Sequence, residues 1–261
     1  MDDQRVWKEL LARPDISLVV LCGPFVGRID LVVAARDAGK AVIVAEPPFL
    51  SLHEIDLLAT REDPDHVATA SLMPLRMLLE DTPGFSNSAW TKGACGVLTL
   101  SRFTPTRRGA PSAPGTGGLS SMILALAPYV DLVCHLFGHP VGVQLAASGD
   151  RTAAGLVKFA SGALLSLAVT LDAPSERDRL EIMDVPQSIV LDGRRLQVNS
   201  SDGVRLLELP SMHDLRLSAY RDIAAQLTTG GSSLRHGADG GRGLALFLDM
   251  VERDGMTGAR P

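Results

Sequence analysis

The stretch 16–58, ISLVVLCGPFVGRIDLVVAARDAGKAVIVAEPPFLSLHEIDLL, decides the fold, because two apolar strands and an intervening helix follow there in close order. Residues 16–22 form a continuous apolar run of strand length, and residues 26–38 carry apolar side chains at helical spacing. Gly39 and Lys40 end that helix just before a second apolar run at 41–45. This order predicts a strand–helix–strand unit in a parallel sheet. Since ligands bind at the carboxyl ends of parallel strands, residues 23–28 and 46–48 are expected at the rim of a crevice.

The segments around this unit extend it into an α/β chain. Residues 1–15 predict a short amphipathic helix, Ser51 and Glu54 predict a capped helix to about residue 60, and residues 67–72 predict a third strand. Residues 94–100 are strand-like, residues 104–118 predict a loop, and residues 119–137 predict a long apolar helix that ends at Gly138. Short alternating runs between 141 and 209 are typical of an open antiparallel sheet, and helices are expected at 214–228 and 242–253.

The composition is that of an ordinary globular protein. A net charge of −5 with scattered basic residues argues against nucleic acid and anionic membranes as partners. No signal region and no apolar run of transmembrane length is present, so we expect a cytoplasmic protein. The cysteines Cys22, Cys95 and Cys134 lie in apolar surroundings and are expected to be buried free thiols. The histidine spacing predicts no metal site.

Four segments carry a resemblance to a known family: PDISLVVLCGP at 14–24, DAGKAVIVAEP at 37–47, GGLSSMILALAPYVDLVCHLFGHP at 117–140 and VKFASGALLSLAVTL at 157–171. In this order and spacing they resemble the glucose–fructose oxidoreductase / inositol dehydrogenase (Gfo/Idh/MocA) family. The resemblance implies a partial Rossmann-like parallel sheet that lacks the first strands, in residues 1–72. A C-terminal α+β domain with a large, open, mainly antiparallel sheet is expected in residues 73–261, and its final helices are able to pack back on the first domain.

The chain departs from this family at the positions that carry its chemistry. In relatives, a lysine that polarises the substrate hydroxyl stands where this chain has Glu46, so the charge is reversed. The aspartate and histidine that relatives use to hold substrate and transfer a proton correspond to Leu124 and Pro128, which do not titrate. Asp131 matches a motif residue that we expect to be structural. Three further polar positions of the family motifs correspond to Phe25, Arg28 and Ser71.

The usual dinucleotide fingerprint is also absent from the sequence. A Rossmann site uses a G-x-G-x-x-G turn after the first strand, which lets backbone amides approach the pyrophosphate. The glycine clusters at 115–118 and 237–243 do not follow strands in the required way and are better explained as loops. The sequence therefore predicts that no cofactor is bound, with NAD(P) kept as an alternative.

These observations lead to three hypotheses about function. The first is a non-redox acid/base enzyme (isomerase, lyase or cyclase) acting on a small metabolite in a biosynthetic or catabolic pathway. The second is a pseudoenzyme or partner subunit, and the third is an NAD(P)-dependent oxidoreductase with unconventional cofactor binding. The candidate catalytic residues are Glu46, as acid or base, and Tyr129. The candidate substrate-binding residues are Arg28, Ser71, Trp90, Lys92 and His135.

The first strand of the parallel sheet predicts a partner chain. A central Rossmann strand that has lost its neighbours becomes an edge, and ISLVVLC is too apolar to remain exposed there. We therefore expect a homo-oligomer, such as a homodimer, or a hetero-oligomer, in which the opening helix or another chain covers this edge or the open sheet forms the interface.

Overall fold

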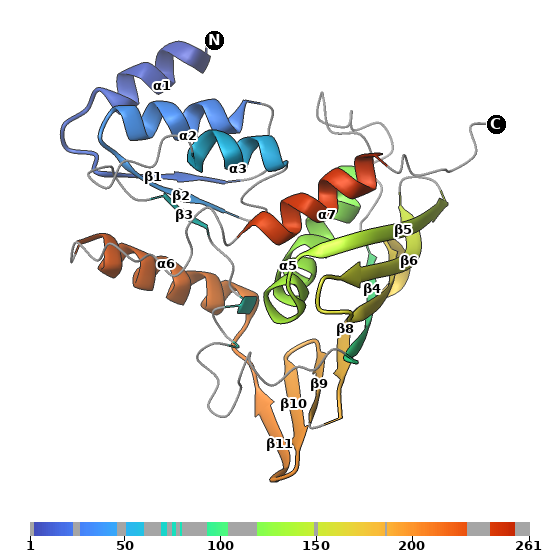
Figure 1. Ribbon diagram of the computed structural model, residues 1–261. Coiled ribbons are helices and arrows are strands. Elements are labelled where there is room, and N and C mark those ends of the chain that lie inside the picture. The colour runs from blue at the N-terminus through green and yellow to red at the C-terminus, as the bar shows by residue number, and fades with distance from the viewer. Residues whose placement is uncertain are drawn as a thin grey trace.

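The computed structural model describes residues 3–22, 27–45, 51–59, 69–71, 75–76, 79, 93–103, 119–148, 151–185, 187–228 and 241–253. These residues form two separate sheets (Figure 1). The smaller sheet has three parallel strands in the order β1-β2-β3, and the larger has eight strands in the order β11-β10-β9-β8-β4-β7-β6-β5. The α/β fold class predicted from the sequence is confirmed.

The first sheet alternates with helices along the chain. Its elements are α1 Asp3–Leu11, β1 Leu18–Leu21, α2 Arg28–Asp37, β2 Ala41–Val44, α3 Leu52–Ala59 and β3 Thr69–Ser71. Strand β2 is buried along its whole length because it lies between β1 and β3, and Val32 and Ala35 of α2 pack in the same core. The backbone N–H of Glu54 donates to Ser51 Oγ at 3.3 Å, which is the N-cap that the sequence predicted for α3.

The second sheet is built around its central strand β4. Its elements are β4 Cys95–Phe103, β5 Pro140–Ser148, β6 Thr152–Phe159, β7 Leu164–Thr170, β8 Asp172–Met183, β9 Gln187–Asp192, β10 Arg195–Ser200 and β11 Gly203–Glu208. Strand β4 pairs parallel with β7 and antiparallel with β8, and the remaining pairs are antiparallel. The apolar helix α5, Leu119–Phe137, packs on one face, where Phe137 and Phe159 meet edge to face with ring centroids 5.5 Å apart.

Two helices late in the chain pack on these sheets. Ala219 and Ile223 of α6, Met212–Thr228, pack against Ile43 of β2. Helix α7, Arg242–Arg253, contacts α5, α3 and β5, and its Ala245 belongs to the core of the parallel sheet (Figure 1). Helix α7 therefore carries apolar contacts to both sheets.

Some expectations need correction. Cys22 and Cys95 are exposed, and only Cys134 is buried, although all three thiols are free. Strand β8 begins at Asp172 rather than near residue 179, because its outward-facing charged residues hide the alternation. The expected domain boundary between residues 72 and 73 stays a prediction. Among the described helices, none combines the length and apolar character needed to cross a membrane.

Candidate functional site

The carboxyl ends of the three parallel strands lie level with one another. Leu21 of β1 pairs with Val44 of β2, and Val44 pairs with Ser71, the last residue of β3. Ser71 is thus at the rim that the sequence predicted for a crevice. Glu46 follows β2 by two residues and lies outside the described residues, as do Trp90 and Lys92.

Arg28, a candidate substrate-binding residue, begins helix α2 and is buried. Its side chain is 1% exposed. Burial lowers the pKa of the Arg28 guanidinium, and the charge of Glu54 on α3 acts in the opposite direction. The residue therefore places a positive charge between α2 and α3, inside the domain.

One stripe of α5 carries Pro128, Asp131 and His135, since residues three and four apart share a helix face. Asp131 forms a bidentate ion pair with Arg76, whose Nε donates to Asp131 Oδ2 at 3.1 Å and whose Nη2 donates to Oδ1. Both side chains are buried. This pair fixes the middle of α5 against the segment that follows β3, in keeping with the structural role expected for Asp131.

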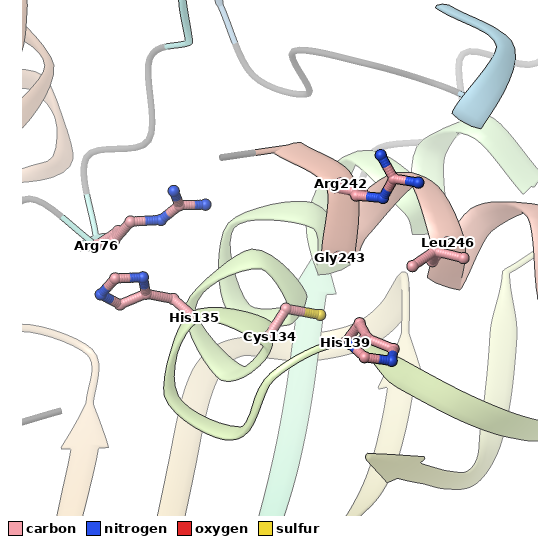
Figure 2. A pocket seen from close by; sticks show the side chains of 7 residues that line it. All are labelled: Arg76, Cys134, His135, His139, Arg242, Gly243 and Leu246. Atoms are coloured by element: carbon pink, nitrogen blue, oxygen red, sulfur yellow. The ribbon is translucent and has the colours of Figure 1, made fainter. Parts of the chain in front are cut away.

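A pocket of about 560 Å³ opens beside this ion pair. Figure 2 shows Arg76 and His135 at one side of the pocket and Arg242 and Leu246 at the other. Arg242 also lies with its Nη1 atom 4.0 Å from Asp56 Oδ1 of α3. The residues that line the pocket are Arg76, Cys134, His135, His139, Arg242, Gly243 and Leu246. The pocket can offer hydrogen-bond donors to an oxygen-rich ligand.

The floor of the pocket is a close contact between α5 and α7. A Cβ added at Gly243 would lie 2.5 Å from the Cβ of Cys134, so only glycine allows the two helices to approach this closely. Burial, followed by the charge of Asp131, raises the pKa of the Cys134 thiol. The thiol therefore stays protonated near neutral pH and packs as a small apolar group instead of acting as a nucleophile.

A second polar cluster joins α5 to the large sheet. Tyr129 Oη donates to Asp178 Oδ2 at 3.0 Å, and Arg102 Nη2 of β4 pairs with the same oxygen. Burial, then the charge of Asp178, raises the pKa of the Tyr129 phenol, so this group keeps its proton. Burial also raises the pKa of Asp178, against the charge of Arg102 and the Tyr129 hydrogen bond.

Two atoms of this cluster stand out. Within the part of the chain that the structure describes, Asp178 Oδ1 and Arg102 Nε are buried without a hydrogen-bond partner. Such groups are costly to leave unsatisfied. Tyr129, Asp178 and Arg102 thus form a partly buried polar cluster between α5 and the large sheet.

The structure brings together only some of the residues predicted for the site. His135 lines the pocket and Ser71 lies at the rim, whereas Tyr129 belongs to the separate cluster with Asp178. Sequence reasoning missed Arg76, Arg242, Arg102 and Asp178. One sequence feature could have identified Asp178. It shares a face of β8 with the buried residues Leu180 and Ile182, and a carboxylate on such a face needs a partner. No metal-binding group of three acidic, histidine or cysteine residues occurs among the described residues.

Comparison with solved structures places this architecture among known proteins. UDP-N-acetylglucosamine 3-dehydrogenase GnnA from Acidithiobacillus ferrooxidans superposes with a TM-score of 0.75 at 16% identity, over 96% of this chain and 81% of its own. Levoglucosan dehydrogenase in complex with NADH and levoglucosan has a TM-score of 0.76 at 17% identity, and the match covers 95% of this chain and 80% of the dehydrogenase. An oxidoreductase from Agrobacterium radiobacter in complex with NAD⁺, L-tartaric acid and magnesium has a TM-score of 0.72 at 16% identity, and the match covers 97% of this chain and 81% of the oxidoreductase. Neither the protein-family models nor the curated proteins gave a match.

These neighbours are oxidoreductases of the Gfo/Idh/MocA type, so the predicted resemblance is confirmed at the level of the fold. They also correct two expectations. The prediction of a degenerate, non-redox protein is wrong, because the neighbours are dehydrogenases. The prediction that a cofactor is absent is wrong too, because several of them are complexes with NADH or NAD⁺. The sequence argument equated changed side chains with lost chemistry, whereas the backbone architecture of the dehydrogenases is retained.

Proposed function

We propose that the protein, which has the Gfo/Idh/MocA fold, is an NAD(P)-dependent oxidoreductase that acts on a secondary alcohol of a small polyhydroxylated compound. The observation that carries this proposal is the match of both sheets and their helices to dehydrogenases over 94–97% of the chain. Some of these neighbours are complexes with levoglucosan, L-sorbose or L-tartaric acid, and another is a UDP-N-acetylglucosamine 3-dehydrogenase; all four compounds are rich in hydroxyl groups.

The chain's own residues would hold such a substrate between the sheet rim and α5. Oxidation of an alcohol releases the hydroxyl proton, which needs an acceptor close by. We assign this role to Glu46, since it follows β2 by two residues in the sequence and the end of β2 pairs with the end of β3 at the carboxyl rim. His135 and Arg242 of the pocket are placed to bind further hydroxyl or acidic groups of the substrate. NAD(P), when bound, supplies the hydride chemistry.

The described residues do not fit the pyrophosphate of that cofactor. A Rossmann pyrophosphate rests on the N-terminus of the helix after the first strand. Under the resemblance β1 belongs to the second half of a Rossmann sheet, so α2 is not that helix, and its first turn carries the acidic Asp30. The three-stranded sheet therefore provides a substrate rim without a phosphate cradle.

The purified protein would be tested with NAD⁺ and NADP⁺ against levoglucosan, L-sorbose, L-tartrate and UDP-N-acetylglucosamine, by absorbance of the reduced dinucleotide. Substrate binding would be measured in parallel by saturation-transfer NMR, with His135→Ala as the pocket variant. Reduction with any pair supports the proposal, as does substrate binding that is lost in His135→Ala. Absence of both reduction and binding would overturn it.

A further inference from the structure

The pocket beside the Arg76–Asp131 ion pair gathers basic side chains from separate parts of the chain. Arg76 follows β3, His135 lies in the last turn of α5, His139 follows that helix, and Arg242 begins α7 (Figure 2). Among the described residues that line the pocket, none is acidic. Its volume of about 560 Å³ lies within the range of small-molecule sites. The pocket therefore combines room for a small ligand with a basic lining.

Arg242 stands at the end of α7 where a basic residue is least favourable. The helix macrodipole places partial positive charge at the N-terminus, which acidic side chains stabilise and basic ones destabilise. The first turn of α7 contains no acidic residue. Asp56 of α3 lies 4.0 Å from Arg242 Nη1, but both side chains are more than half exposed, so solvent weakens their attraction. The Arg242 guanidinium and the helix terminus therefore attract an anion to the same place.

The other described groups around the pocket leave this attraction in place. Arg76 and Asp131 form a buried bidentate pair and balance each other's charge. Burial raises the pKa of the Cys134 thiol, so this group stays uncharged. A Cβ added at Gly243 would lie 2.5 Å from the Cβ of Cys134, so the close contact of the two helices holds the N-terminus of α7, with Arg242, at the pocket.

The donors of the pocket suit a phosphate or carboxylate group. A guanidinium offers N–H groups in a planar fork that matches two oxygen atoms of an oxyanion. Imidazole N–H groups and the first backbone N–H groups of a helix can each add a hydrogen bond. A neutral hydroxyl would use some of these donors but would gain nothing from the charge of Arg242. The lining thus favours an oxyanion over a neutral sugar group.

The pocket is also close along the chain to the rim of the parallel sheet. Ser71 ends β3 at that rim, and Arg76 lines the pocket five residues later. Even when fully extended, five residues span at most about 18 Å. The rim and the pocket are thus near enough for one extended small molecule.

We propose that this pocket binds an oxyanion, a phosphate or carboxylate group, at one end of the substrate, with Arg242 as its main ligand. His135, His139 and the N-terminus of α7 supply further hydrogen bonds. The inference rests on the proposed function and narrows its substrates. The alcohol that is oxidised at the sheet rim belongs to a polyhydroxylated acid or to a phosphate monoester of a polyol.

Isothermal titration calorimetry of the 261-residue protein would compare three six-carbon probes: neutral D-glucitol, D-gluconate and D-glucitol 6-phosphate. We expect at least one of the two acids to bind about tenfold or more tightly than D-glucitol, since hydrogen bonds between charged groups are stronger than those between neutral groups. The acid that binds more tightly identifies the oxyanion. NMR signals of the His139 ring should shift with that acid, which locates it in the pocket.

Three variants separate the charge at the pocket from the general charge of the protein. Arg242→Gln keeps a polar side chain without the charge and should reduce the preference for the acid by about tenfold or more. Arg242→Lys restores the charge and should bind the acid more tightly than Arg242→Gln does. Since the Arg242 side chain is 54% exposed, both variants should fold like the wild type, which circular dichroism would check.

The matched control is Arg253→Gln. It removes an arginine from the opposite end of α7, eleven residues or roughly 16 Å away, whose side chain is 79% exposed. Because the net charge changes as in Arg242→Gln while the pocket is untouched, this variant should bind all three probes like the wild type.

The remaining outcomes decide against the inference. Equal affinities for D-glucitol and both acids would overturn it, as would an acid preference that persists in Arg242→Gln or disappears in Arg253→Gln. These titrations contain no dinucleotide, so they do not depend on the oxidation. Reduction of NAD⁺ or NADP⁺ with neutral polyols, without an acid preference in binding, would support the proposed function and overturn this inference. Acid binding that depends on Arg242, without dinucleotide reduction in the presence of either acid, would retain the oxyanion site and count against the proposed function.

Discussion

Replacing Asp131 by Asn would leave the Arg76 guanidinium buried without its counter-ion. The two side chains are 6% and 2% exposed, for Arg76 and Asp131 respectively, and two hydrogen bonds join them. Removing one partner of a buried pair costs about 3–5 kcal/mol, because the remaining charge is left desolvated and unpaired. This is a large share of the roughly 5–15 kcal/mol that stabilises a typical folded protein.

Circular dichroism during urea and thermal denaturation would measure this loss. For a protein of this size, we expect the Tm of Asp131→Asn to fall by roughly 6–20 °C. The matched control is Asp15→Asn, which removes the partner of Arg13 in a pair that is about 60% exposed on both sides. Solvent screens that pair, so the control should denature like the wild type.

A double variant tests whether the buried charge is the cause. Arg76→Met with Asp131→Leu replaces the pair by apolar side chains, which is often neutral or stabilising when the packing is good. We expect the double variant to regain most of the stability that Asp131→Asn loses. A loss below about 1 kcal/mol in Asp131→Asn, or a double variant no more stable than the single one, would refute the reasoning.

Four further predictions follow from other parts of the structure. Gly243→Ala forces α7 away from α5 and should lower the free energy of unfolding by about 1–3 kcal/mol, whereas Gly142→Ala, whose new Cβ meets nothing closer than 4.0 Å, should denature like the wild type. Burial raises the folded-state pKa of Asp178, so the folded protein binds this proton more tightly than the unfolded chain. The urea midpoint of the wild type should therefore rise relative to that of Asp178→Asn as the pH falls from 7 toward 4. A difference between the two midpoints that does not change with pH would argue against this. Glu46→Gln should lower kcat by about 10²–10⁴-fold in the dinucleotide assay, and unchanged turnover would remove Glu46 as the proton acceptor. Leu206→Glu replaces an exposed leucine of strand β11 by a charged residue and should convert a homodimer formed through the open sheet into a monomer in light scattering; an unaltered mass would exclude that interface.

Local sequence signals predicted the elements of this fold well. Helix α5 ends at Phe137, as predicted, because Gly138 adopts a positive φ of 85° that other residues rarely tolerate. The cap at Ser51 is a contact over three residues, and the sequence shows both of its members. These features depend on neighbours along the chain, so their causes are visible without the structure.

The contacts that build the site are different in kind. Arg76 and Asp131 are 55 residues apart, and Tyr129 and Asp178 are 49 apart, so no spacing rule connects them. Only the packing of α5 on the sheet and on the segment after β3 brings them together. Arg242 reaches the pocket because Gly243 lets α7 contact Cys134, a requirement that composition does not reveal.

The polar groups along α5 have a consequence for the length of the substrate. The family resemblance places the proton-transfer histidine of relatives at position 128, which is proline here, whereas His135 lies seven residues further along the same stripe. Seven helical residues span roughly 10 Å. Arg76, His135 and Arg242 line the pocket near that end of α5. Glu46 follows the last residue of β2 by two positions in the sequence. A substrate that uses both regions must extend further along α5 than one held at positions 124 and 128. Under the proposed function, extended polyhydroxylated compounds should therefore bind better than single-ring sugars, because only they reach both groups.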